Sequence, residues 1–159
     1  MTFIDFCSGI GGGRLGLELN GFKCLGFSEI DKEAIKTYKT FFDTTNELEF
    51  GDLTKINSNK LPNFDLLISG FPCQSFSIVG KREGFKNKQK GQILFDLIEI
   101  LKIKQPKYFI LENVKGFINH QKGETLKQTI MLLESCNYKV FHKVLNTIDF
   151  GLAHSRERV

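Results

Sequence analysis

The sequence predicts an α/β protein built on a mostly parallel, doubly wound sheet. Short apolar segments of strand character alternate with segments of helical periodicity along the chain. Polar, glycine or cysteine residues follow the strand segments, and no internal repeat or low-complexity tract interrupts the alternation. Because a β-α-β alternation gives parallel strands covered by helices on both faces, we expect ligands beyond the carboxyl ends of the strands.

The first half of the chain contains three expected strands and two expected helices. Residues 3–6 are apolar and lead into a glycine-rich turn at 9–13, after which Leu15, Gly16 and Leu19 share a helix face. The remaining features are a helix stop at Asn20-Gly21, a strand at 23–27, a helix at 32–42, a polar stretch at 43–63 and a buried-type strand at 64–69.

The second half opens with a basic, glycine-containing loop at 75–91. Apolar residues at helical spacing between Leu94 and Leu101 mark a helix, which Pro106 ends. The remaining elements are a buried-type strand at 108–111, a helix around 126–133 and a last strand at 139–145.

Composition is typical of a soluble protein of about one domain. The chain has 159 residues, 41% of them hydrophobic, and a net charge of +4 that permits nucleic-acid binding without requiring it. There is no membrane-spanning apolar run and no secretion signal, so we expect a cytoplasmic protein. The four cysteines have no zinc spacing, and we expect neither a metal site nor disulfides, which leaves a thiol free for chemistry.

The first candidate site is the glycine-rich turn. Glycines let the backbone approach a ligand at a helix N-terminus, and Glu29 ends the next strand, where an acid can hold ribose hydroxyls. A dinucleotide fingerprint is not met, because its third glycine, counted from Gly9, would fall on Arg14. A tight turn beside an exposed glutamate is the alternative interpretation.

The second candidate is Cys73, which follows a buried-type strand in Gly70-Phe71-Pro72-Cys73. A helical turn that begins there would favour the thiolate, and Pro72 restrains the backbone beside it. The alternative is a buried thiol that acts as a small hydrophobic residue. We expect that alternative for the cysteines in or beside apolar segments, which are Cys7, Cys24 and Cys136.

Two further candidates lie in the second half. Glu112 follows the strand at 108–111 and suits proton transfer if burial favours its neutral form, although a helix cap or turn explains it equally well. Arg156 and Arg158 point the same way if the segment is extended, and they suit a carboxylate, a phosphate or a base carbonyl. The alternative for the arginines is a solvated charged tail.

Taken in order, these segments resemble the DNA (cytosine-5)-methyltransferase family of bacterial restriction-modification systems. The most specific pieces are F-P-C-Q at 71–74 and E-N-V at 112–114, supported by D-F-x-x-G-x-G-G from Asp5 and R-E-R at 156–158. The resemblance implies the Rossmann-like fold of methyltransferases that use S-adenosylmethionine as cofactor, without a metal. The residues it implies for cofactor binding are Phe6, Gly9, Ile10, Gly11, Gly12, Glu29, Ile30, Asp52, Leu53, Pro72 and Ile93.

The resemblance also implies a reaction on duplex DNA. Cys73 would attack C6 of a cytosine flipped out of the base stack, so that C5 becomes able to take a methyl group. Glu112 would stabilise charge at N3, while Arg156 and Arg158 would hold O2 and position Glu112. The segment after the cysteine would contact DNA through Gln74, Ser77, Lys81 and Arg82.

The sequence departs from the family pattern in places. Cys7 and Ile30 stand where the family has Phe and Trp against the cofactor, His154 replaces Gln, and 90–93 read K-G-Q-I where R-G-x-L is common. Family members continue past the last arginine into an antiparallel strand between the strand before Glu112 and the one at 139–145. We therefore expect 1–159 to be an incomplete catalytic and cofactor-binding domain, truncated before its last strand, without the target-recognition region and C-terminal helix.

The leading hypothesis is a DNA methyltransferase, cytoplasmic and acting at the nucleoid, that needs a second polypeptide for target recognition. One alternative is an inactive remnant that at most binds cofactor, and another is a tRNA cytosine-5 methyltransferase of similar fold. A dehydrogenase is kept only nominally, because Arg14 breaks its fingerprint.

Overall fold

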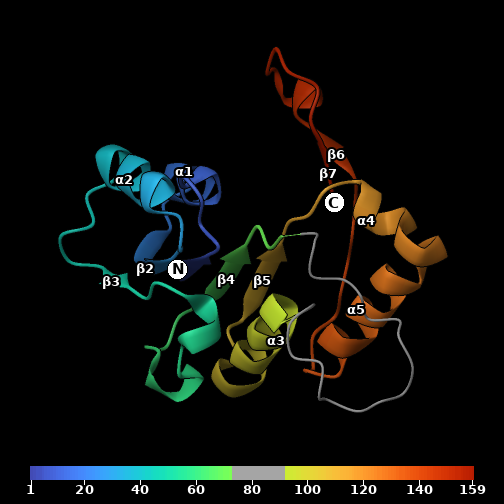
Figure 1. Ribbon diagram of the computed structural model, residues 1–159, viewed down its shortest axis with the longest axis horizontal. Helices are drawn as coiled ribbons and strands as arrows, with labels where there is room; N and C mark the ends of the chain where they lie inside the picture. The colour runs from blue at the N-terminus through green and yellow to red at the C-terminus, as the bar shows by residue number, and fades with distance from the viewer. Residues whose placement is uncertain (73–91) are drawn as a thin grey trace. The chain divides into compact units, whose positions relative to one another are not determined.

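The computed structural model describes residues 1–72 and 92–159 (Figure 1). The chain forms two compact units, of which the first comprises Met1–Phe71 and Glu99–Leu111. The second comprises the described parts of Pro72–Ile98 together with Glu112–Val159. Within the described ranges, no helix is both long and apolar enough to cross a lipid bilayer.

A five-stranded parallel sheet forms the centre of the first unit (Figure 1). Strand β1 pairs in parallel with both β2 and β4, so that Phe3 lies opposite Cys24 on one side and Leu66 on the other. The predicted α/β class with a mostly parallel sheet is therefore confirmed. The strands are β1 (Thr2–Phe6), β2 (Lys23–Ser28), β3 (Leu48–Glu49), β4 (Leu66–Ser69) and β5 (Tyr108–Leu111), in the order β3-β2-β1-β4-β5.

Helices α1 (Gly12–Leu19) and α2 (Lys32–Phe41) cover the same face of this sheet. Leu17 of α1 packs in a buried cluster with side chains from β1, β2 and β4, including Phe3. The Tyr38 ring of α2 stacks on Phe27 at 4.3 Å between centroids, and alternation along the strands puts Phe27 on the face that carries Phe3. The other elements of this unit are η1 (Leu53–Lys55), η2 (Ser58–Lys60) and the Glu99–Lys104 part of α3 (Gln92–Lys104).

Helix α1 buries a different side from the one that its apolar spacing predicts. Leu15 and Leu19 share a face, but they are 52% and 79% exposed. The buried residues are Leu17 and Arg14. The helix itself forms as predicted, but the Arg14 guanidinium makes a buried ion pair with Glu47, so the helix turns this cation inward.

The second unit contains short helices and an antiparallel hairpin. Strands β6 and β7 pair through Leu145 and Arg158, and Arg158 also bridges Val114 in antiparallel sense. Glu157 and Arg158 thus already lie between Val114 and 145–146, in the place that the family resemblance assigns to a strand beginning after Arg158. The elements are α4 (Gly116–Asn119), η4 (His120–Gly123), α5 (Glu124–Glu134), β6 (Leu145–Asn146), η5 (Thr147–Phe150) and β7 (Glu157–Arg158).

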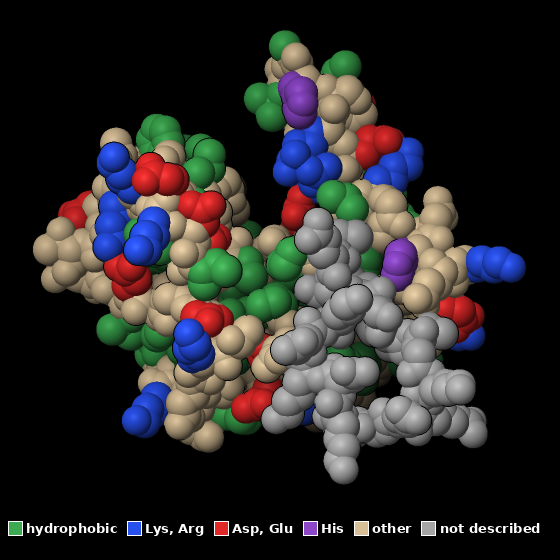
Figure 2. Space-filling view, in the orientation of Figure 1, with side chains coloured by type: hydrophobic (Ala, Val, Ile, Leu, Met, Phe, Trp, Pro, Cys, Tyr) green, Lys and Arg blue, Asp and Glu red, His purple; other side chains and the backbone are tan. Residues whose placement is uncertain are grey.

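The strand predicted at 139–145 is mostly not formed. In the part of the chain that the structure describes, ladder pairing begins only at Leu145, because β7 lies opposite residues 145 and 146 alone. Apolar side chains remain exposed at the far end of the β6–β7 hairpin (Figure 2). These are Ile148, Phe150 and Leu152.

Candidate functional site

Hydrogen bonds join the carboxyl ends of three neighbouring strands in the first unit. The backbone NH of Ser8 donates to the carbonyl of Ser28 at 3.1 Å. The Ser28 hydroxyl in turn donates to the carbonyl of Gly51 at 2.6 Å. We call the resulting surface the β1–β3 edge, and define it as residues 7–12 after β1, 29–30 after β2 and 51–53 after β3.

Glu29 holds the glycine-rich turn of the β1–β3 edge in place. Its Oε2 accepts a hydrogen bond from the NH of Gly9 at 2.8 Å, and its Oε1 accepts from Ile30 and Asp31 at 2.8 and 3.0 Å. An ionised carboxylate offers about four acceptor positions, so Oε2 keeps one for a ligand hydroxyl. The rule that ligands bind at strand ends predicted that Glu29 and the glycines would meet.

The turn leaves open space and an unpaired polar group. A Cβ added at Gly9 or Gly12 would meet no heavy atom within 4 Å. The buried Ser8 hydroxyl has no hydrogen-bond partner among the described residues. Ile10 and Ile30 expose 57% and 71% of their surface. Exposed apolar side chains beside an unpaired hydroxyl suit a ligand that is partly apolar and partly hydrogen-bonding, such as a nucleoside.

Asp52 adds an anionic group to the same edge. Its Oδ1 accepts hydrogen bonds from the NH and the hydroxyl of Thr54 at 3.0 and 2.8 Å, and Lys55 Nζ lies 3.2 Å from Oδ2. The hydrogen bonds from Thr54 hold the pKa of Asp52 below its usual value, so this carboxylate is an acceptor at neutral pH. Phe6 and Leu53 are buried in this unit.

The second unit brings together Glu112 and Arg158. The Nε of Arg158 lies 2.6 Å from Oε1 of Glu112, and the side chains are 23% and 42% exposed, respectively. The backbones of Asn113 and Val159 exchange two hydrogen bonds, at 2.8 and 3.0 Å. This short antiparallel ladder places Arg158 beside Glu112.

A second ion pair ties the same strand to residues after Glu112. Lys115 Nζ lies 2.7 and 2.8 Å from the two carboxylate oxygens of Glu157. Because successive side chains of an extended strand alternate, Glu157 and Arg158 point to opposite sides of β7. Arg156 is exposed, and its backbone NH donates to the Asn146 side chain at 2.9 Å.

Five of the predicted site residues lie outside the described residues, and two of the predicted cofactor-binding residues lie in the described part of the second unit. Pro72 is exposed and Ile93, in α3, is partly buried. Within the described ranges, no group of three or more His, Cys, Asp and Glu side chains is arranged to hold a metal ion. The five outside the described residues are Cys73, Gln74, Ser77, Lys81 and Arg82.

Two of the three other cysteines are buried, as predicted. Cys24 and Cys136 are 4% and 2% exposed. Cys7 is partly exposed, because β1 ends at Phe6 and Cys7 already belongs to the turn, with φ of 51°. The prediction of a buried Cys7 was therefore wrong. Desolvation still raises its pKa to about 11, so the thiol is protonated at neutral pH.

The sequence profile of C-5 cytosine-specific DNA methylases matches residues 1–159. The chain belongs to the C-5 cytosine-specific DNA methylase family. Among its relatives, the type II methyltransferase M.BsuFI of Bacillus subtilis is 48% identical over 159 residues, which are 100% of this chain and 38% of the relative. The type II methyltransferase M.NgoBI of Neisseria gonorrhoeae is 47% identical over 156 residues, which are 98% of this chain and 48% of the relative.

The family fold is also visible in solved structures. The crystal structure of the S. pombe Dnmt2 methyltransferase aligns with a TM-score of 0.78 at 21% identity, covering 99% of this chain and 49% of that one. At this identity the match shows the shared fold. The methylase chain described here thus spans less than half the length of these relatives.

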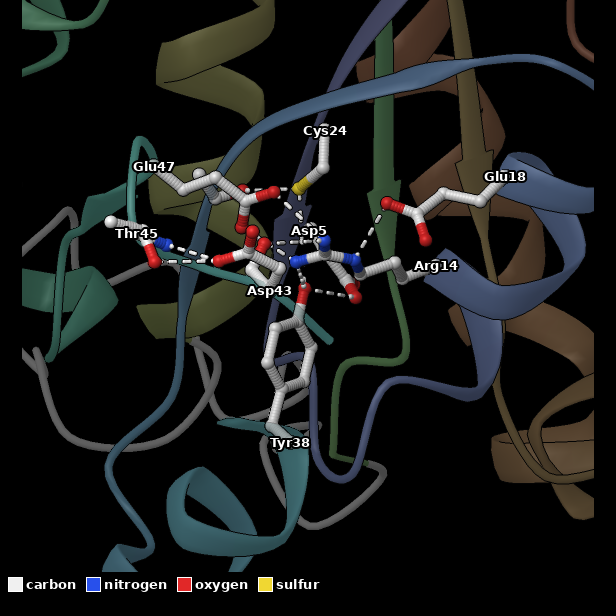
Figure 3. Close-up of polar contacts among 9 residues, drawn as sticks. Asp5, Arg14, Glu18, Cys24, Tyr38, Asp43, Thr45 and Glu47 are labelled. Carbon is white, nitrogen blue, oxygen red and sulfur yellow. Dashed lines mark hydrogen bonds and ion pairs between the residues drawn. The ribbon is translucent and has the colours of Figure 1, made fainter. Parts of the chain in front are cut away.

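Sequence reasoning missed the buried polar network behind the β1–β3 edge. Arg14, noted only because it breaks a dinucleotide fingerprint, is 3% exposed and reaches between Glu18 and Glu47 (Figure 3). The Tyr38 hydroxyl connects the same network to Asp5 on β1, at 3.5 Å. The sequence feature that could have revealed this network is an arginine beside the apolar positions of a helix, with a glutamate four residues later.

Proposed function

We propose that this chain carries the cofactor-binding part and the acid part of a methyltransferase that modifies C5 of cytosine in duplex DNA. The observation that carries the proposal is the contact between Glu112 and Arg158. These residues belong to E-N-V and R-E-R, two motifs that are far apart in the sequence. Their pairing at 2.6 Å is what a carboxyl group positioned against a base would require.

The β1–β3 edge suits S-adenosylmethionine as its ligand. Glu29 would accept a ribose hydroxyl, and Asp52 would accept from the adenine amine. The backbone of Gly9 and Gly12 has the open space that close approach of the methionine part requires. We also propose that other residues bind the cofactor, some by side-chain contact and some through the backbone. These are Phe6, Ile10, Gly11, Ile30, Leu53, Pro72 and Ile93.

When bound, the cofactor supplies an electrophilic methyl group on a sulfonium. Cytosine C5 is too weak a nucleophile to take this methyl group unaided. We propose that the Cys73 thiolate would add to C6 and place electron density on C5, so that a carbon–carbon bond could form there as the methyl–sulfur bond breaks and leaves a neutral thioether. Transfer of the C5 proton to a solvent base would then restore the C5–C6 double bond and expel the thiolate. The target base must leave the stack for Cys73 to reach C6, at a cost of a few kcal/mol.

Glu112 and Arg158 would act on the edge of the same base. Protonated Glu112 would donate to N3 and so stabilise the charge that develops there when Cys73 adds to C6. Arg158 would hold the carboxyl group in position, and with Arg156 it would contact O2. Gln74, Ser77, Lys81 and Arg82 would contact the DNA around the flipped base.

Recognition of a particular DNA site would come from sequence beyond the residues that match the relatives. We propose that a second polypeptide, or a longer form of the chain, supplies it. An inactive remnant would at most bind the cofactor, so it differs from the proposed enzyme in transferring no methyl group when the remaining sequence is supplied. Equilibrium dialysis with labelled S-adenosylmethionine tests the cofactor site: the chain should bind, and Glu29→Gln should weaken binding about tenfold or more, because a carboxylate acceptor is lost. Binding that Glu29→Gln leaves unchanged would contradict the assignment of the edge.

A further inference from the structure

The Arg14 guanidinium makes several polar contacts, most of them with residues outside α1. Its Nη1 and Nη2 bind the two carboxylate oxygens of Glu47 at 2.6 and 2.8 Å, and its Nε binds Glu18 at 2.9 Å. Nη2 also donates to the carbonyl of Asp43 at 3.4 Å. These bonds use the planar fork of a guanidinium, which a lysine cannot reproduce. They fasten the start of α1 to the segment that follows α2.

The guanidinium also lies against two aromatic rings. Its central carbon is 4.4 Å from the centroid of the Phe42 ring and 5.2 Å from that of Tyr38. Nη1 donates to the Tyr38 hydroxyl at 3.4 Å. A cation over an aromatic face is attracted by the ring's quadrupole, and more strongly where water is excluded. Arg14 therefore fixes the positions of both rings.

The same two rings form the wall behind the glycine-rich turn. Gly11 has φ of +92°, and an added Cβ would lie 2.3 Å from Cε2 of Phe42 and 3.0 Å from the Tyr38 ring. The backbone of Gly11 therefore packs directly on the rings that Arg14 holds. Its NH donates to the carbonyl of Ser8 at 2.9 Å, which closes the turn.

We infer that Arg14 is a positioning residue for cofactor binding, which acts through Phe42 and Tyr38 on the turn at 7–12. The inference rests on the proposed function, because it takes this turn as the cofactor site. Arg14 itself is buried behind the rings and is not assigned a contact with the cofactor. Its removal would let the rings move, the turn would sample other conformations, and part of the binding free energy would be spent on ordering it.

The test measures the turn itself before any ligand is added. Amide hydrogen exchange followed by NMR reports the opening of the Gly9 and Gly11 amides, and the β1 amide of Ile4 reports the stability of the sheet. In Arg14→Met, exchange at Gly9 and Gly11 should accelerate about tenfold or more relative to Ile4. Dialysis with labelled S-adenosylmethionine should show a matching loss of affinity.

Two further variants make the result decisive. Phe42→Leu keeps every ion pair of Arg14 but removes the ring behind Gly11, so it should also loosen the turn. This variant tests the inference even if Arg14→Met fails to fold. Lys39→Met removes an exposed ion pair between α2 and Glu49, and should change neither exchange nor binding.

Unchanged exchange at Gly9 and Gly11, relative to Ile4, in Arg14→Met or in Phe42→Leu would overturn the inference. Failure of the unmodified chain to bind S-adenosylmethionine would instead overturn the proposed function. The exchange comparison would still decide whether Arg14 holds the turn, so the two failures are distinguishable.

Discussion

The Nε of Arg158 lies 2.6 Å from Oε1 of Glu112, and this ion pair joins β7 to the first residue of the segment at 112–114. Both side chains keep access to solvent. A partly exposed pair adds only about 0–1 kcal/mol to stability. We therefore expect this ion pair to affect activity more than stability.

Arg158→Met should abolish most of the activity while leaving the fold intact. In a reconstituted enzyme, methyl transfer should fall about 100-fold or more, because the carboxyl group of Glu112 loses the group that orients it. The melting temperature should move by only a few degrees. A large loss of stability, or activity near that of the unmodified protein, would contradict this role.

Lys115 and Glu157 should matter through the register of β7 rather than by contact with substrate. Lys115→Glu places two like charges together and should loosen the strand that carries Arg158. The double variant Lys115→Glu with Glu157→Lys restores the pair with its charges reversed, and should recover most of the lost activity. A double-mutant cycle on methyl transfer measures the coupling, and activities that simply multiply would exclude the register role.

Asp5 should make stability depend on pH. Burial raises its pKa to about 8, although the Arg14 cation and a hydrogen bond from Tyr38 oppose the shift. The folded state holds this proton more tightly than the unfolded state. The resulting contribution of Asp5 to the free energy of unfolding is therefore complete below about pH 4 and is lost as pH rises towards about 8. Asp5→Asn cannot ionise, so its advantage in melting temperature over the unmodified chain should grow from pH 5 to pH 8. A constant difference would show that Asp5 does not titrate in this range.

Two neighbouring glycines should respond differently to the same change. Gly11→Ala forces a Cβ to within 2.3 Å of the Phe42 ring, at a positive φ, and should cost about 2 kcal/mol or more. Gly12→Ala meets no atom within 4 Å and lies at the start of α1, so its stability should stay within about 1 kcal/mol of the unmodified chain. Thermal unfolding of both variants gives the comparison. Gly12→Ala should nevertheless weaken S-adenosylmethionine binding, since its methyl group enters the space assigned to the ligand.

Much of the framework could be predicted from the sequence because it depends on local periodicity. The alternation of apolar strands and amphipathic helices predicted the parallel sheet, and the sheet placed Glu29 beside Gly9. The burial of Arg14 could not be predicted in this way, because its partner Glu47 lies in a polar stretch without periodicity. The segment at 139–144 has strand-like composition, but a strand also needs a neighbour to pair with, and composition does not provide one.

The most direct test is transfer of a labelled methyl group from S-adenosylmethionine to duplex DNA. The chain would be assayed alone and with the remaining portion of a type II relative supplied as a separate polypeptide, each with Cys73→Ala as control. The account predicts label on cytosine C5 in the complemented mixture, and none in the Cys73→Ala control. Duplex DNA left unlabelled by folded, complemented protein, or label that persists in Cys73→Ala, would contradict it.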